Sequence, residues 1–215
     1  MPESTPRRSV AVIAVLAFAL ACAAHELLGH GAACAASGGT IVELNSVRFR
    51  CAGGGLAADL GGPLANAWVG LGGLGLLRVR RWSPAATLAL ELGVAFNLLW
   101  IAGCLLWSAI AGRSDFAFAI RMAADGAPGA RGLLALAGVM LGRFTLRRLT
   151  LSRAMARLAW LAAGTACCVS VLLCAGPLLP LLREAALEGF GAMAWLLFVP
   201  ARGGPAAPGR HAVPS

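Results

Sequence analysis

The stretch that decides the fold is residues 10–36, VAVIAVLAFALACAAHELLGHGAACAA. A helix that crosses a bilayer needs about 20 mostly apolar residues, and this stretch is longer than that. Counting this one, six apolar stretches cover residues 10–36, 60–77, 84–111, 133–142, 158–182 and 185–199. The first, third and fifth are long enough to span, the second and last are short, and the fourth has the length of a half helix. The sequence therefore predicts an all-α polytopic membrane protein with five or six transmembrane helices.

The composition supports the same class. Hydrophobic residues make up 59% of the chain and charged residues 13%, whereas a soluble domain carries about 25% charged residues. The absence of a short repeat, a heptad pattern or a high charge density argues against collagen, coiled-coil and disordered classes. We expect a cytoplasmic N-terminus at residues 1–9, one membrane domain over residues 10–200, and a disordered tail at residues 201–215.

The basic residues are all arginine, 18 of them against nine acids, and the net charge is +9. They lie between apolar stretches, where the arginine bias of cytoplasmic loops explains them better than nucleic-acid binding does. We therefore expect the lipid bilayer as a partner and no nucleic acid. Six spans with the N-terminus inside place twelve arginines in the cytoplasm, namely Arg7, Arg8, Arg78, Arg80, Arg81, Arg143, Arg147, Arg148, Arg153, Arg157, Arg202 and Arg210. The six outside are Arg48, Arg50, Arg113, Arg121, Arg131 and Arg183.

Residues 38–50, GGTIVELNSVRFR, differ in character from the apolar stretches on either side. Here β-branched or aromatic residues alternate with polar ones, and glycines lie at both ends, which predicts a short strand or hairpin after the first span. The seven cysteines contain no CxxC pair and lie mostly in apolar stretches. That spacing indicates neither a disulfide framework nor a zinc knuckle, so for most of them we expect a packing role.

The first span contains three ionisable residues within six positions, His25, Glu26 and His30. Such residues are rare inside a membrane and indicate function. Two histidines on one helical face can hold zinc while the adjacent glutamate activates a zinc-bound water. Residues five apart, however, are separated by about 140° on a regular α-helix, against about 40° for residues four apart. We therefore predict a π-bulge or kink around residues 27–29, which Gly29 would ease.

The string His25-Glu-Leu-Leu-Gly-His30 resembles the zinc motif of dipeptidyl peptidase III. Over residues 9–120 the chain resembles the site-2 protease group of intramembrane zinc metalloproteases, of the M50 type. The resemblance rests on this motif, on the small residues and glycine-bounded β segment after it, and on Gly61-Gly-Pro-Leu-Ala-Asn66 in the second span. It extends to Arg113-Ser-Asp115, although the chain lacks the LDG or NPDG string that the group carries around its aspartate.

The resemblance implies a zinc ion held by His25, His30 and Asp115, with Glu26 as the general base. Asp59 and Asp125 are alternative third ligands. Asn66 either orients the substrate backbone or bonds between helices. The expected function is hydrolysis of peptide bonds in transmembrane or membrane-proximal segments, by a multi-pass protein of the bacterial inner membrane.

Two other functions remain open. The chain could be a non-catalytic metal-binding or structural relative, or an ion transporter, although no inverted repeat supports a transporter. The arginine count places all the candidate residues toward the outer side of the membrane, whereas members of the site-2 protease group generally cut from the cytoplasmic side.

Overall fold

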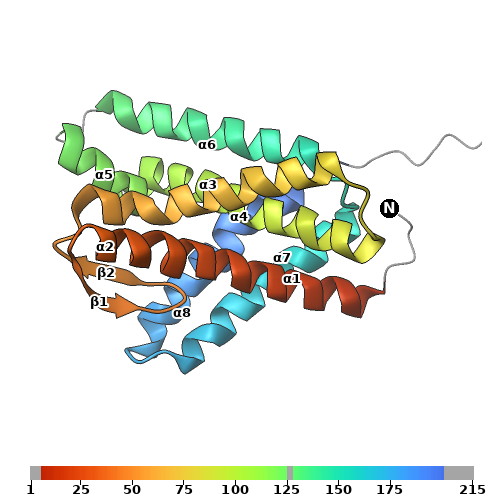
Figure 1. Cartoon of the computed structure of the whole chain (residues 1–215), viewed down its shortest axis with the longest axis horizontal. Coiled ribbons are helices and arrows are strands. Elements are labelled where there is room, and N and C mark those ends of the chain that lie inside the picture. The colour runs from red at the N-terminus through yellow and green to blue at the C-terminus, as the bar shows by residue number, and fades with distance from the viewer. Residues whose placement is uncertain (1–5, 125–127, 201–215) are drawn as a thin grey trace, which may run out of the picture.

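The computed structural model describes residues 6–124 and 128–200. In this part of the chain, five helices are long and apolar enough to cross a membrane, namely Arg7–Ala36, Gly55–Val79, Pro84–Ala111, Gly129–Arg148 and Arg153–Leu173. The helices run along the long axis of the molecule, with a small two-stranded sheet at the end opposite the start of α1 (Figure 1). The predicted class, a helical membrane protein with a short hairpin after the first span, is confirmed.

The first span is one continuous helix with an irregular middle. It consists of α1 (Arg7–Cys22), the π-helix η1 (Ala23–Gly31) and α2 (Ala32–Ala36). The buried side of α1 carries only apolar residues, which pack on α4 and α7. Beyond Arg7 and Arg8 at its start, the histidines and the acidic residue of this span all lie in η1.

The hairpin follows directly and consists of β1 (Thr40–Leu44) and β2 (Phe49–Ala52), which pair antiparallel with a bulge between Ile41 and Glu43. The side-chain oxygen of Asn45 accepts hydrogen bonds from the backbone N–H groups of Val47 and Arg48, which closes the turn. Asparagine favours turns because its side chain can replace a backbone acceptor in this way.

The helices α3 (Gly55–Val79) and α4 (Pro84–Ala111) follow. α4 is the central helix of the bundle, in contact with α1, α3 and α6, and its side chains are the most buried of the five spans. The Ser83 hydroxyl caps its start by accepting from the N–H of Ala86. Its end is set by Gly112, whose φ of 64° is the left-handed conformation that glycine adopts readily.

The second half begins with α5 (Asp115–Ala124), α6 (Pro128–Arg148), α7 (Arg153–Ser170) and the short η2 (Val171–Leu173). The apolar stretch at residues 133–142, by itself only long enough for a half helix, lies within the full-length helix α6. The parts of α6 outside that stretch contain four arginines, and arginine is a good helix former. The close packing of α6 on α4 depends on Gly138, where a Cβ would lie 2.9 Å from the carbonyl oxygen of Ala102.

The last segment is a broken helix that consists of α8 (Leu178–Ala186), η3 (Leu187–Gly191) and η4 (Ala192–Phe198). It packs on α7 but is not among the five candidate spans, so the structure supports the lower of the two expected span counts. The expected disordered tail at residues 201–215 lies outside the described residues, as does the start of the N-terminal segment.

Candidate metal centre

The π-helix η1 places His25 and His30 on one face. In π geometry the backbone bonds run from each residue to the fifth one along, so residues five apart lie nearly above one another. The predicted distortion around residues 27–29 is present and covers the whole of Ala23–Gly31. Gly29 is required within it, because a Cβ there would lie 2.5 Å from the Cα of Gly62 on α3. The π-helix and α3 therefore cross backbone against backbone.

The two imidazoles meet Asp115, which lies at the start of α5. The Nε2 atoms of His25 and His30 are 3.2 Å apart. A carboxylate oxygen of Asp115 lies 3.4 Å from Nε2 of His25, and the other lies 3.6 Å from Nε2 of His30. In the described part of the chain these three residues form a group whose ligand atoms all lie within 4.8 Å of one another, and such a group could hold a metal ion.

The spacing of these atoms suits zinc. Zinc binds imidazole nitrogen and carboxylate oxygen at about 2.0–2.2 Å, usually with tetrahedral geometry, and two ligand atoms of such a tetrahedron are about 3.4 Å apart. The two Nε2 atoms are 3.2 Å apart, and the two oxygens of Asp115 lie 3.4 and 3.6 Å from one Nε2 atom each. Without a cation or a proton between them, two imidazole lone pairs and a carboxylate would repel one another. The three residues therefore form a group that could hold a metal ion such as zinc.

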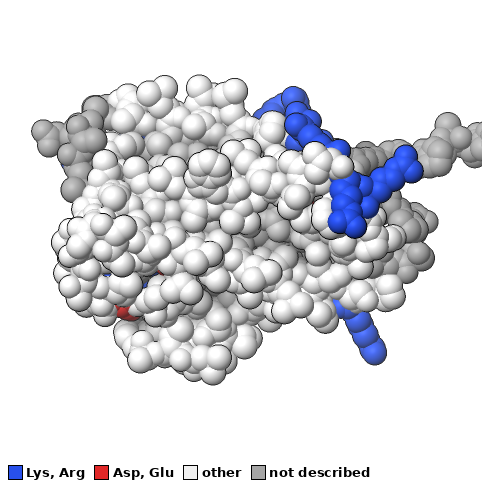
Figure 2. All heavy atoms as spheres, in the orientation of Figure 1, with Lys and Arg blue, Asp and Glu red and all other residues white. Residues whose placement is uncertain are grey.

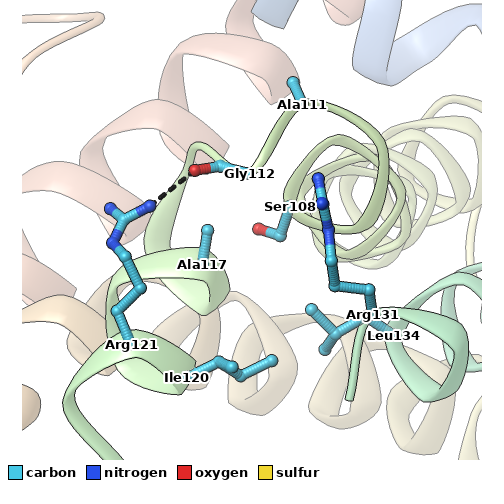
Figure 3. A pocket seen from close by; sticks show the side chains of 8 residues that line it. All are labelled: Ser108, Ala111, Gly112, Ala117, Ile120, Arg121, Arg131 and Leu134. Atoms are coloured by element: carbon cyan, nitrogen blue, oxygen red, sulfur yellow. Dashed lines mark hydrogen bonds between the residues drawn. The ribbon is translucent and has the colours of Figure 1, made fainter. Parts of the chain in front are cut away.

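The turn before Asp115 is held by two arginines. After Gly112 ends α4, Ser114 adopts a φ of 87°, a rare conformation for a residue with a side chain and one that is often found at functional sites. Arg121 donates to the carbonyl of Gly112, and Arg131 donates to the carbonyls of the last turn of α4. Figure 3 shows both guanidinium groups beside this turn, in a pocket that Ser108 also lines. These contacts fix the end of α4 and so position Asp115.

The Nδ1 atom of each imidazole contacts a polar group of α3. Nδ1 of His30 lies 2.6 Å from the carbonyl oxygen of Ala58, so it donates there and leaves Nε2 free for a metal. Nδ1 of His25 lies 3.1 Å from the side-chain nitrogen of Asn66, which is fully buried. The amide oxygen of Asn66 has no partner in this orientation. Exchange of the two amide atoms by a flip of about 180° gives that oxygen a partner, because it then accepts from Nδ1–H of His25 and leaves Nε2 for the metal position.

Two aromatic rings and a glycine surround the two imidazoles. The ring of His25 stacks on Trp100 of α4, with centroids 5.0 Å apart, and the ring of His30 stacks on Phe49 of β2, also at 5.0 Å. A Cβ on Gly62 would lie 2.7 Å from Nε2 of His25 and closer still to Nε2 of His30. The position therefore requires a glycine if both rings are to keep their places.

Glu26 is buried beside the two ligands, and one of its carboxylate oxygens has no hydrogen-bond partner. It interacts electrostatically with His25, His30 and Asp115. Burial raises the pKa of Asp115, but the two histidines beside it outweigh burial and hold that pKa below its ordinary value. Asp115 is therefore a carboxylate, which is the form that binds a metal. Its side chain is 19% exposed, against 4% for His25, so Asp115 is the most exposed of the three groups.

The other predicted site residues that the structure describes are not part of the three-residue group. Asp59 is half-buried on α3 and interacts electrostatically with Asp115 and His30, but it is not part of the three-residue group. Asp125 lies outside the described residues. Asn66 contacts a candidate ligand, and no contact with an open cavity is seen.

Sequence reasoning missed several features of the site. Two of them depend on the packing of α3 on η1. The first is the contact of His30 with the carbonyl of Ala58, and the second is the space that Gly62 leaves for the two imidazoles by having no side chain. Glu188 of η3 also escaped notice, although it interacts electrostatically with Glu26 and Asp115 and has a buried oxygen without a partner. An acidic residue within the last apolar stretch was the one indication of it in the sequence.

A disulfide bond joins Cys34 of α2 to Cys51 of β2. The expectation that the cysteines form no disulfide framework therefore overlooked one bond. The pairing brings together residues 17 positions apart and depends on the hairpin folding back over α2. The remaining described cysteines are free, as expected for packing residues.

Comparisons with protein-family models, with curated proteins and with solved structures found no match. The arrangement of the residues themselves is therefore the basis for any functional conclusion.

Proposed function

We propose that this protein is a membrane-embedded zinc metalloprotease, similar to the site-2 protease group. The observation that supports this most is the convergence of two imidazoles and a carboxylate beside a buried glutamate, His25, His30 and Asp115 beside Glu26. Catalytic zinc sites keep three protein ligands and one open position, and a zinc ion held by these three residues alone would have such a position. Structural zinc sites use four protein ligands.

A zinc ion held by His25, His30 and Asp115 would supply a Lewis acid that polarises a carbonyl and makes a water more acidic. The carboxylate of Glu26 would accept the proton of the attacking water and return it to the leaving amine, the two roles of a general acid–base group. Its free carboxylate oxygen is available for that proton. Asn66 and the carbonyl of Ala58 act as positioning groups that keep the Nε2 atoms of the two histidines directed at the metal.

The proposed substrate is a transmembrane or membrane-proximal segment of another polypeptide. The site lies within a bundle whose outer surface is apolar, with Leu64 and Trp68 of α3 exposed by 57% and 79%. Such side chains face lipid in a membrane, so a substrate that reaches the site laterally must itself be lipid-soluble. We place the protein in the cell membrane of a bacterium as a multi-pass protein.

The deep burial of both imidazoles favours one alternative, a metal-binding membrane protein that does not cut. His25 and His30 are 3% and 4% exposed, which would suit a purely structural ion as well. The two functions differ in their dependence on Glu26. Glu26 is not a ligand in either case, but only the protease needs its carboxylate.

The test uses purified zinc-loaded protein in liposomes with a panel of model transmembrane peptides in water enriched in ¹⁸O. Hydrolysis inserts one ¹⁸O atom into each new carboxyl group, and mass spectrometry detects it. We expect labelled fragments with the wild type and none with Glu26→Gln, which retains its zinc. Labelled fragments from metal-free protein or from Glu26→Gln would overturn the proposed mechanism. A wild type that holds zinc and cuts no peptide of the panel would favour the structural ion.

A further inference from the structure

The disulfide bond lies beside the metal centre. Cys34 follows His30 by one helical turn, and Cys51 follows Phe49, whose ring stacks on His30, by two residues. The bond thus ties α2 to the strand that covers a candidate ligand. Disulfides form and persist in oxidising compartments and are rare in the cytosol. The disulfide therefore indicates that this end of the molecule lies outside the cytoplasm.

The distribution of arginine is a second and independent observation. In the described residues, the end of the bundle where α1 begins carries ten arginines, namely Arg7, Arg8, Arg78, Arg80, Arg81, Arg143, Arg147, Arg148, Arg153 and Arg157. Figure 2 shows arginines gathered there. Cytoplasmic ends of spans carry such an excess. The opposite end holds the hairpin (Figure 1), and the metal centre lies beside it, because the ring of His30 stacks on Phe49 of β2.

Three of the six arginines of the hairpin end are matched by acceptors. Arg48 forms an ion pair with Glu184 of α8, and the hydrogen bond with Glu184 raises the pKa of Arg48. Arg121 and Arg131 donate to backbone carbonyls around the end of α4. These three cations therefore serve local structure, and the larger number of arginines lies at the other end.

The metal centre is close to the hairpin-end surface. His30 lies six residues before the end of the first span at Ala36, which corresponds to about 9 Å along a helix. Asp115 lies just beyond the end of α4 at Ala111. The hydrocarbon core of a bilayer is about 30 Å thick. The site therefore lies nearer to the surface of the leaflet next to the disulfide than to the opposite surface.

We infer that the metal centre opens to the non-cytoplasmic, oxidising side of the membrane and that its substrate is a polypeptide segment presented at that face. The part that concerns substrate rests on the proposed protease function, whereas the orientation of the site does not. The disulfide and the distribution of arginine each indicate this orientation. It is opposite to that of the protease group that the sequence resembles, whose members generally cut from the cytoplasmic side.

One experiment uses two matched reporters, Val42→Cys on β1 and Val79→Cys at the end of α3. Both valines are exposed, by 57% and 79%, and neither is charged, so the substitutions leave the arginine pattern intact. A membrane-impermeant maleimide is added to sealed right-side-out and inverted vesicles, with the parent chain giving the background. We expect the reporter at 42 to react only in right-side-out vesicles and the one at 79 only in inverted vesicles. The reverse pattern would overturn the inference.

A second experiment uses the unmodified chain, so it does not depend on how a variant folds. Membranes are denatured in a thiol-alkylating reagent, before or after reduction, and the mass of the intact protein is measured. The five free cysteines should react before reduction and all seven after it. Seven modified cysteines without reduction would mean that the hairpin end lies in a reducing compartment. Neither readout requires cleavage, so loss of the protease proposal would leave this inference standing.

Discussion

Replacement of Gly62 by alanine should remove the metal while leaving the fold in place. The added Cβ would lie 2.7 Å from Nε2 of His25, and closer to Nε2 of His30. Ordinary contact requires about 3.5 Å, so a ring must move by about 0.8 Å or more. Zinc sites tolerate deviations of about 0.2 Å in a ligand distance. At least one imidazole is therefore lost, and we expect zinc affinity to fall by at least about 100-fold, or about 2.8 kcal/mol.

The matched control is Gly72→Ala on the same helix, where a Cβ would meet nothing within 4 Å. Alanine is a better helix former than glycine by about 1 kcal/mol, so this variant should be at least as stable as the wild type. Zinc affinity is measured by competition with a chromophoric chelator, and thermal unfolding of the metal-free proteins reports the fold. If Gly62→Ala binds zinc within threefold of the Gly72→Ala control, no metal lies between the two imidazoles and the site assignment fails.

Three further outcomes are expected. Deletion of Leu28, which is 65% exposed, shortens the histidine spacing to four; the π-helix should relax to an α-helix and zinc should remain, whereas loss of zinc would contradict the role given to the π-helix. Glu26→Gln should keep zinc and lower the cleavage rate by at least about 10²-fold, as measured on any substrate that the peptide panel identifies. Arg131→Ala should weaken zinc binding by about tenfold in chelator competition, because the end of α4 before Asp115 loses its support. The exposed Arg183 on α8 provides its control, and equal affinities for Arg131→Ala and Arg183→Ala would refute that support.

The sequence was sufficient for features that depend on local pattern. The spans were predictable because the thickness of the bilayer fixes the apolar length that a spanning helix needs. The hairpin was predictable because the alternation of β-branched or aromatic residues with polar ones, and the glycines at both ends, are local signals. The π-helix followed from the five-residue spacing of His25 and His30, since only that geometry brings both to one metal. A local average of hydropathy failed at α6, where arginine-containing ends extend the helix beyond its apolar centre.

The features that were missed depend on contacts between distant segments. No local pattern indicates that the carbonyl of Ala58 accepts from His30 across 28 positions, or that Gly62 leaves space for two rings. The partner of Cys34 became apparent only once the hairpin lay over α2. Asn66 was recognisable in the sequence as a polar residue within a span, but its contact with His25 could be found only in three dimensions.

X-ray absorption at the zinc edge tests the central claim, a zinc ion bound by His25, His30 and Asp115, most directly. Nitrogen and oxygen ligands lie about 2.0–2.2 Å from zinc, and cysteine sulfur at about 2.3 Å, so the chain's free cysteines would be recognised at once. We predict one zinc per chain with two imidazole nitrogens, remaining ligands of oxygen and no sulfur, and loss of this spectrum in His25→Ala. A sulfur shell, or an unchanged spectrum in His25→Ala, would contradict the account.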